Sequence, residues 1–240
     1  MKTNIYALHG FLGLPADWDD IKRELGEQLH TPDLFAISHP SNGLQSFGHA
    51  FNKYVAQEPA IKRILLGYSL GGRLSLHALL DEPELWTGAI IISANTGISY
   101  DKEKEARYKN DIRWSQRFLN DEWKALIKDW NSQNAFSGQA PAFHRKETNY
   151  LREHLAEALV HWSLAKQNDL QDCIAKLPVP ILWIAGEKDI KYVEIARRIS
   201  AHHSQSSFWI APGAGHRVPW EATELFAEKI KLWLTNFPTQ

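Results

Sequence analysis

The most informative segment of the chain is Leu65-Leu66-Gly67-Tyr68-Ser69-Leu70-Gly71-Gly72. It contains a G-x-S-x-G pattern directly after an apolar, strand-like run and directly before a helix-like run. In that setting the serine lies on a tight strand-to-helix turn, and the small residues around it let neighbouring backbones approach. The N-terminus of the following helix favours negative charge near the hydroxyl. The segment predicts a nucleophile at Ser69, and the alternative is a glycine-rich turn without chemistry.

Strand-like and helix-like runs alternate on both sides of this segment. The predicted strands cover residues 4–8, 34–38, 63–68, 88–93, 179–185 and 208–211. The predicted helices cover residues 18–29, 47–56, 70–80, 195–202 and 221–234. This alternation is typical of right-handed βαβ units, so we expect an α/β protein with a mostly parallel sheet and helices on both faces.

Residues 99–170 interrupt the alternation. They contain no convincing strand, are highly charged and carry four tryptophans: Trp114, Trp123, Trp130 and Trp162. We expect them to form a helical cap over the carboxyl edge of the sheet, where open α/β sheets bind ligands. The predicted core then comprises residues 1–98 and 171–240, and the predicted class is the α/β-hydrolase fold with an inserted cap.

A serine nucleophile in this fold needs a base and an orienting carboxylate, in the chain order serine, acid, histidine. Asp189 follows the predicted strand at 179–185 and is the expected acid, with Glu187 as a competitor nearer the strand end. His216 ends the run Pro212-Gly213-Ala214-Gly215-His216 after the next strand, and small residues there suit a loop that delivers an imidazole to a crowded site. We expect Ser69, Asp189 and His216 to form a catalytic triad.

The run Leu8-His9-Gly10-Phe11-Leu12-Gly13 follows the first predicted strand. It resembles the loop that supplies one backbone N–H to an oxyanion hole, so we expect the N–H groups of Phe11 and Leu70 to be the two donors. His9 is expected to brace this loop.

Composition limits the classes of partner. The 240 residues carry a net charge of -1, which gives no electrostatic reason to expect nucleic acid or an anionic membrane as the main partner. No apolar run approaches the roughly 20 residues of a membrane span, so we expect no stable membrane insertion. The one cysteine, Cys173, can form no internal disulfide, and we expect a buried, inert thiol and a cytoplasmic location. No G-x-G-x-x-G or P-loop pattern occurs, and we expect neither metal nor cofactor.

A closer resemblance extends over most of the chain. The run Gly67-Tyr68-Ser69-Leu70-Gly71-Gly72-Arg73 resembles the nucleophile turn of the 2-succinyl-6-hydroxy-2,4-cyclohexadiene-1-carboxylate synthase family of menaquinone biosynthesis. Gly186-Glu187-Lys188-Asp189 is similar to its acid loop. The cap carries a matching pattern in order and spacing: Glu105-Ala106-Arg107, Asp111, Trp114, Gln116-Arg117-Phe118-Leu119 and Asp129-Trp130.

The resemblance implies a lyase. Such an enzyme eliminates pyruvate from a succinylated enolpyruvyl-cyclohexene carboxylate, with Ser69 and His216 acting as the base that removes a ring proton. The substrate is a small polycarboxylate, which needs fixed cations. By position, the resemblance implies substrate contacts from Arg107, Trp130 and Arg152. We also expect substrate contacts from Arg73, one turn into the predicted helix, and from Tyr68, which flanks Ser69.

The chain also departs from that family. Where the family commonly has an acidic-Leu-Pro-Gly-His-Gly loop, residues 37–43 read Ile-Ser-His-Pro-Ser-Asn-Gly. This difference bears on the fine specificity of the site. The alternatives are an ordinary serine esterase or C–C bond hydrolase on the same triad, and a binding protein that kept the fold. The sequence does not distinguish a monomer from a homo-oligomer.

Overall fold

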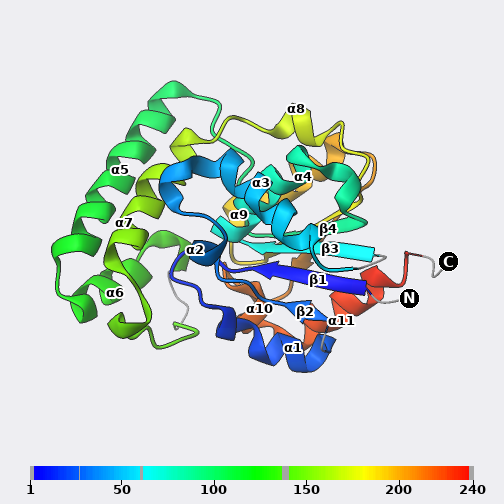
Figure 1. Cartoon of the computed structure of the whole chain (residues 1–240), viewed down its shortest axis with the longest axis horizontal. Coiled ribbons are helices and arrows are strands. Elements are labelled where there is room, and N and C mark those ends of the chain that lie inside the picture. The colour runs from blue at the N-terminus through cyan, green and yellow to red at the C-terminus, as the bar shows by residue number, and fades with distance from the viewer. Residues whose placement is uncertain (1–2, 27, 60–61, 137–140, 238–240) are drawn as a thin grey trace.

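A single parallel sheet of six strands organises the chain (Figure 1). The computed structural model describes residues 3–26, 28–59, 62–136 and 141–237. The strands are β1 (Thr3–Leu8), β2 (Leu29–His30), β3 (Lys62–Tyr68), β4 (Gly88–Ile92), β5 (Ile181–Gly186) and β6 (Ser206–Ala211). They pair in the order β2-β1-β3-β4-β5-β6, and all five pairings are parallel. The expectation of a mostly parallel sheet is confirmed.

Helices cover both faces of this sheet. The core helices are α1 (Asp19–Leu25), α2 (Leu34–Ile37), α3 (Gly43–Ala56), α4 (Leu70–Asp81), α8 (Gln171–Ile174), α9 (Ile190–His202), α10 (Val218–Glu221) and α11 (Thr223–Leu234). Side chains alternate between the faces, as the pleat of a strand requires. Tyr6 and Leu8 of β1 share a hydrophobic cluster with α3, α4 and α9, whereas Ile5 and Ala7 share another with α1 and α11.

The predicted strand at residues 34–38 is wrong. Residues 34–37 form the short helix α2, and the Asp33 side chain accepts a hydrogen bond from the Phe35 N–H (3.0 Å) at its N-terminus. A short apolar run fits a buried strand and a buried helical turn equally well, and here the capping aspartate selects the helix. The second strand lies earlier, at β2, because α1 ends at Gly26 with φ +93°.

After β4 the described chain continues into α5 (Asp101–Asn120), α6 (Trp123–Asn131) and α7 (Arg152–His161), which precede α8 and β5. We use the word cap for residues 99–170, the predicted boundaries. The strands point their carboxyl ends toward these helices (Figure 1). A third hydrophobic cluster joins the cap to the core, because Leu12 of the loop after β1 packs with Trp114, Phe118 and Leu155.

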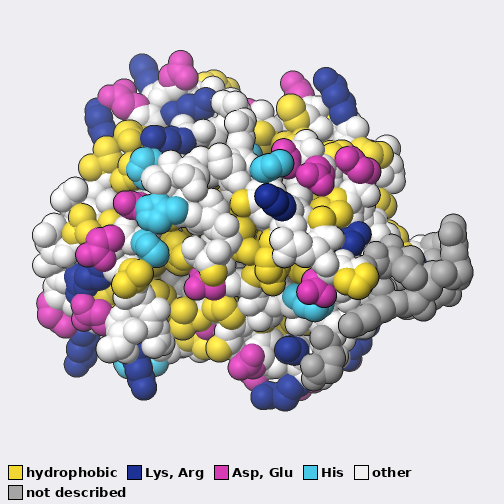
Figure 2. Space-filling model, in the orientation of Figure 1, with side chains coloured by type: hydrophobic (Ala, Val, Ile, Leu, Met, Phe, Trp, Pro, Cys, Tyr) yellow, Lys and Arg dark blue, Asp and Glu magenta, His cyan; other side chains and the backbone are white. Residues whose placement is uncertain are grey.

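The surface mixes charges of both signs. Figure 2 shows Lys and Arg interspersed with Asp and Glu over this face of the molecule, in keeping with the net charge of -1. Among the described residues, no helix has the length and apolar character to cross a membrane. Cys173 is exposed on α8, so the predicted buried thiol is wrong; its neighbour Ile174 takes the buried position.

Candidate active site

Ser69 lies between β3 and α4 in a backbone conformation that few side chains adopt. Its φ is +53° and its ψ is -110°. The turn is possible because its neighbours lack a Cβ: one on Gly71 would collide with the carbonyl oxygens of Leu8 and His9, and one on Gly67 with Ser75 Oγ. The strained turn directs the Ser69 hydroxyl away from the sheet edge and toward the histidine loop.

The Ser69 hydroxyl belongs to a hydrogen-bonded chain of three side chains. His216 Nδ1 lies 2.6 Å from Asp189 Oδ2, and because a carboxylate only accepts, this imidazole nitrogen donates. The other nitrogen, Nε2, lies 3.1 Å from Ser69 Oγ and is then free to accept the hydroxyl proton. His216 is only 4% exposed, so the pair operates away from bulk water. The structure thus brings together all three residues predicted as the triad.

Asp189 and its competitor Glu187 have different partners. Asp189 contacts His216, whereas Glu187 accepts a hydrogen bond from the Gly213 N–H (2.9 Å). The first carboxylate orients the imidazole and the second braces the loop that carries it. Both come from the turn after β5, and Gly186 permits the close approach because a Cβ there would collide with the carbonyl oxygens of Gly215 and Ala214.

The loop after β1 lies beside Ser69. His9 accepts from the Leu34 N–H through Nε2 (3.3 Å) and donates to the Gly10 carbonyl through Nδ1 (2.9 Å), so it braces this loop from below. Leu12 in the same loop has φ +58°. Leu70 is the first residue of α4, where backbone N–H groups point out of the helix. Phe11 and Leu70, the predicted oxyanion donors, both border the cavity that contains Ser69.

This cavity, called the Ser69 cavity below, lies between the carboxyl edge of the sheet and the cap. It combines aromatic walls with cations and hydroxyls. Its lining comprises Phe11, Ser69, Leu70, Arg73, Ser93, Asn95, Arg107, Asp111, Trp130, Ala158, Leu159, Trp162, Ser163, Leu164 and Tyr192. Three predicted substrate contacts, Arg73, Arg107 and Trp130, are therefore among its walls.

The two cavity arginines differ in their partners. Arg107 makes two hydrogen bonds through Nε to the carboxylate of Asp111, at 2.9 and 2.8 Å. Arg73 donates instead to two neutral acceptors, Gln167 Oε1 (3.3 Å) and the Trp162 carbonyl (2.6 Å). Burial, and next the charge of Arg107, lower the pKa of Arg73 to about 10, so it stays protonated at neutral pH. A buried guanidinium without a carboxylate partner among the described residues is suited to bind an anion.

Trp130 borders both the Ser69 cavity and a neighbouring space, whereas Tyr68, also a predicted substrate contact, borders only the neighbouring space. Tyr68 packs its ring 5.6 Å from that of His216 and edge-on to Trp220 at 4.9 Å. Burial raises the pKa of its phenol, which therefore stays protonated. Trp130 contacts Phe11 at 4.7 Å between ring centroids, and these two rings border both spaces.

The neighbouring space, called the side compartment, contains two arginines that the motifs did not indicate. Arg145 pairs with Asp17 through two hydrogen bonds of 2.7 Å and so ties the cap to the core. Arg217, directly after His216, donates to Asn131 Oδ1 and stacks over Phe136 at 4.1 Å. Both line the compartment with Tyr68. Arg217 could have been found from the sequence, because it directly follows the predicted catalytic histidine. No sequence motif indicates Arg145.

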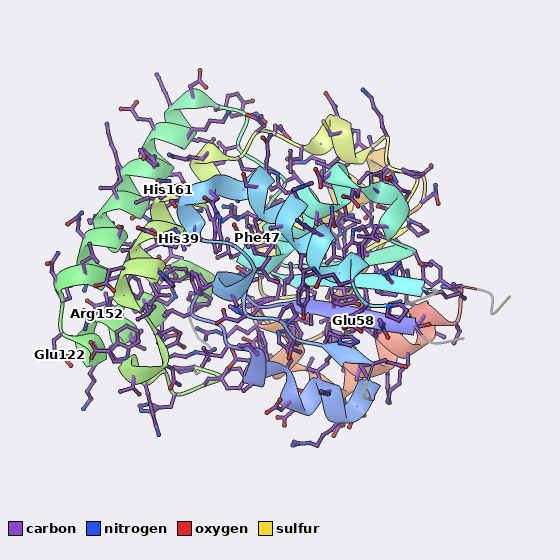
Figure 3. The ribbon with its side chains drawn as sticks, viewed as in Figure 1. His39, Phe47, Glu58, Glu122, Arg152 and His161 are labelled. Carbon is purple, nitrogen blue, oxygen red and sulfur yellow. The ribbon has the colours of Figure 1, made fainter. Side chains whose placement is uncertain are left out.

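Arg152 does not reach either space. Its Nη1 donates to the carbonyls of Phe118 (2.9 Å) and Asp121 (2.8 Å), and its Nε pairs with Glu147 (2.7 Å). Figure 3 shows Arg152 near Glu122, within the cap. Its guanidinium also lies over the ring of Trp123 of α6, at 5.4 Å. The predicted substrate contact from Arg152 is not supported by this placement, because the side chain joins α7 to α5 and α6.

The loop at residues 37–43, where the chain departs from the family pattern, contacts the cap. His39, labelled in Figure 3, has its Nε2 3.1 Å from Glu157 Oε2 of α7, and its ring meets that of His154 edge-on at 5.1 Å. The departure therefore falls on a contact between core and cap.

One group of potential metal ligands occurs among the described residues. His49, Asp81 and Glu82 each place one such atom within 4.8 Å of the others. The group lies at the surface between α3 and α4, and none of its members lines the Ser69 cavity. It gives no reason to assign a metal to the chemistry.

Comparison with known protein families identifies the family of this chain. A family profile described as "Alpha/beta hydrolase family" matches residues 5–229. The chain therefore belongs to the alpha/beta hydrolase family, and the expected fold is confirmed.

Curated relatives define the branch. A Haemophilus influenzae protein, whose name as a 2-succinyl-6-hydroxy-2,4-cyclohexadiene-1-carboxylate synthase is provisional, is 30% identical over 95% of this chain and 96% of its own length. The synthase of Serratia proteamaculans is 29% identical over 95% and 92%. Within the alpha/beta hydrolases, the chain belongs to this synthase family.

Solved structures agree on the fold. A structure described as MenH from S. aureus superposes with a TM-score of 0.87 at 18% identity, covering 98% of this chain and 95% of its own. A thermophilic esterase from Thermogutta terrifontis gives 0.75 at 19% identity, covering 98% and 90%. At sequence identities this low, these structural similarities support the fold alone.

Proposed function

We propose that this chain eliminates pyruvate from a succinylated enolpyruvyl-cyclohexene carboxylate and forms 2-succinyl-6-hydroxy-2,4-cyclohexadiene-1-carboxylate in menaquinone biosynthesis. Membership of the synthase family supports the reaction. The observation that carries the proposal is the pairing, in one cavity, of a hydrogen-bonded Ser69–His216–Asp189 chain with the buried cation of Arg73. A base beside a cation whose hydrogen-bond acceptors are both neutral suits proton removal from an anionic substrate.

The proton path follows from the hydrogen bonds. Ser69 Oγ takes the ring proton while its own proton passes to His216 Nε2, and Asp189 stabilises the resulting imidazolium. The electron pair of the broken C–H bond delocalises into the conjugated ketone of the succinyl group. It then forms the new ring double bond as the C–O bond to the enolpyruvyl group breaks. The leaving enolate takes up the proton held by the His216 imidazolium and becomes pyruvate, which returns the triad to its starting state.

Charge that develops on the ketone oxygen needs donors held in place before the reaction. We assign this role to the backbone N–H groups of Phe11 and Leu70, which border the cavity together with Ser69. The N-terminus of α4 beneath Ser69 adds to the stabilisation of negative charge.

The carboxylates of the substrate need cations. Arg73 and Arg107 supply them within the Ser69 cavity, and the indole of Trp130 would hold the carbon skeleton there, with Tyr68 available to a part of the substrate that enters the side compartment. Arg73 lies directly on the core helix α4, four residues after Ser69. As part of the same proposal, the partner is a small polycarboxylate and the enzyme acts in the cytoplasm, where a chain whose one cysteine forms no internal disulfide needs no oxidising environment.

The test is an assay of the purified protein with the enolpyruvyl precursor, following pyruvate release and the absorbance of the diene. A panel of p-nitrophenyl esters is measured in parallel, because the same triad geometry serves ester hydrolysis. Equal amounts of pyruvate and diene, with negligible ester cleavage, are the expected result. Rapid ester cleavage without pyruvate would establish a serine hydrolase instead.

A further inference from the structure

Ser93 is a wall of the Ser69 cavity that the proposed mechanism does not use. It directly follows β4, the strand next to β3, and its backbone N–H donates to the Ile184 carbonyl of β5 (2.9 Å). The preceding residue, Ile92, accepts from the Ser69 N–H (2.9 Å). Ser93 is therefore fixed on both sides by the sheet, at the same edge as the nucleophile.

The Ser93 side chain is polar, buried and unsatisfied. The residue is 2% exposed, and its Oγ has no hydrogen-bond partner among the described residues. Buried hydroxyls in folded proteins nearly always have a partner, so a hydroxyl that lacks one at the wall of a ligand cavity points to a partner supplied by the ligand.

The backbone of Ser93 supports the same conclusion. Its φ is +47°, in the left-handed region where glycine is favoured and a serine is strained. In the described chain, Leu12, Ser69 and Ser93 are the residues other than glycine with positive φ, and the first two belong to the predicted oxyanion loop and the nucleophile turn. Strain of this kind collects at functional sites, and a glycine would remove it here at no steric cost to the turn.

The surroundings define the chemistry of the missing partner. Arg73 and Asn95 line the cavity with Ser93, and Gln167 links them by accepting from Arg73 and donating to the Asn95 carbonyl (3.0 Å). Arg73 has only neutral acceptors, whereas the carboxylate of Asp111 is already occupied by Arg107 and by Ser163 Oγ (2.7 Å). An unsatisfied hydroxyl and a guanidinium whose hydrogen-bond acceptors are both neutral, in one cavity, fit a carboxylate, which accepts several hydrogen bonds at once.

We propose that Ser93 is a substrate-binding residue whose hydroxyl donates a hydrogen bond to the substrate carboxylate held by Arg73. The proposal rests on the proposed function for the identity of the substrate, and on the cavity alone for the class of ligand. It makes Ser93 a determinant of specificity for anionic substrates.

The experiment compares Ser93→Gly and Ser93→Ala with the wild-type protein. The glycine variant removes the hydroxyl and relieves the backbone strain, and the alanine variant removes the hydroxyl and keeps the strain. Ser200→Ala is the matched control, because Ser200 Oγ is also buried without a partner but lies on α9 outside the cavity lining. Three quantities are measured: kcat/KM for pyruvate release, the Kd for succinate from tryptophan fluorescence, and Tm.

We expect both Ser93 variants to lower kcat/KM and to weaken succinate binding about tenfold, the loss of one hydrogen bond to a charged group. Ser93→Gly should at the same time keep or raise Tm, and Ser200→Ala should match the wild type in activity. A Ser93→Gly variant with unchanged kcat/KM and unchanged succinate affinity would overturn the proposal.

The two proposals fail separately. If the wild type releases no pyruvate, the proposed function is lost, and the succinate titration alone decides the role of Ser93. If the wild type neither releases pyruvate nor binds succinate, the cavity does not take carboxylates and the Ser93 proposal is overturned as well.

Discussion

The carboxyl edge of the sheet and the cap use similar residues in different ways. At the sheet edge, Ser69, Asp189 and His216 come from three distant segments and meet within hydrogen-bond distance. In the cap, two arginines that were both predicted to bind substrate have different roles. Arg107 lines the Ser69 cavity, whereas Arg152 holds helices together.

The difference has a physical origin. The carboxyl ends of parallel strands lie at one edge of the sheet, so the strand order alone positions a polar residue that directly follows a strand at this edge. A residue on an inserted helix points wherever packing rotates the helix, and a long arginine reaches several partners from one position. Chemistry at the sheet edge can therefore be predicted from motifs, and cap contacts only in part.

The largest expected effect belongs to the sheet edge. Ser69→Ala should lower kcat for pyruvate release by about 10⁴-fold or more, because triad members act as a unit. Circular dichroism and Tm, measured on the same preparation, check that the variant is folded. Activity near that of the wild type would show that Ser69 is not a catalytic residue.

The next prediction separates the two acids of one loop. Asp189→Asn should lower kcat about 10³- to 10⁴-fold, because an amide no longer fixes the imidazole in its productive tautomer. Glu187→Gln is the matched control and should stay within about tenfold of the wild type, since its amide oxygen still accepts from Gly213. A larger loss for Glu187→Gln than for Asp189→Asn would exchange their roles.

A third prediction compares arginines of the core and the cap. Arg73→Gln should lower kcat/KM about 100-fold, the upper range for hydrogen bonds to charged groups. Arg152→Ala should leave KM within about twofold but reduce the free energy of unfolding by about 1–2 kcal/mol, since it deprives two carbonyls and Glu147 of their donor. Steady-state kinetics and urea unfolding measure the two effects. An Arg152→Ala variant with a raised KM and unchanged stability would show that Arg152 contributes to substrate binding and not to the packing of the cap.

The core also predicts a pH dependence of stability. Burial, and next the charge of Arg73, lower the pKa of His77 on α4 from 6.5 to about 4. The unfolded chain therefore binds a proton at His77 at a higher pH than the folded chain does. The free energy of unfolding is highest above pH 6.5, where His77 is neutral in both states, and it decreases as the pH falls toward 4. The loss amounts to about 2–3 kcal/mol. Urea unfolding of His77→Gln across this window should show a shallower slope than the wild type; parallel curves would contradict the assignment.

The same contrast explains how much the sequence could predict. The G-x-S-x-G turn, the acid after β5 and the histidine after β6 each carry a local signal, and five strands fall where the apolar runs place them. The strand predicted at residues 34–38 is wrong because four apolar residues have no period of their own, and the cap from Asp33 selects a helix. The cavity positions of Tyr192 and Ser93 were missed, although Ser93 follows a strand end just as Asp189 does.

Whether Ser69 removes a proton or attacks a carbon is the central question. Intact-protein mass spectrometry of samples quenched during turnover of the enolpyruvyl substrate addresses it directly, with a fluorophosphonate adduct on Ser69 as the positive control. The lyase mechanism predicts an unmodified protein mass in every sample while pyruvate accumulates. A population carrying added mass on Ser69, which forms and decays at the rate of turnover, would show that the serine acts as a nucleophile.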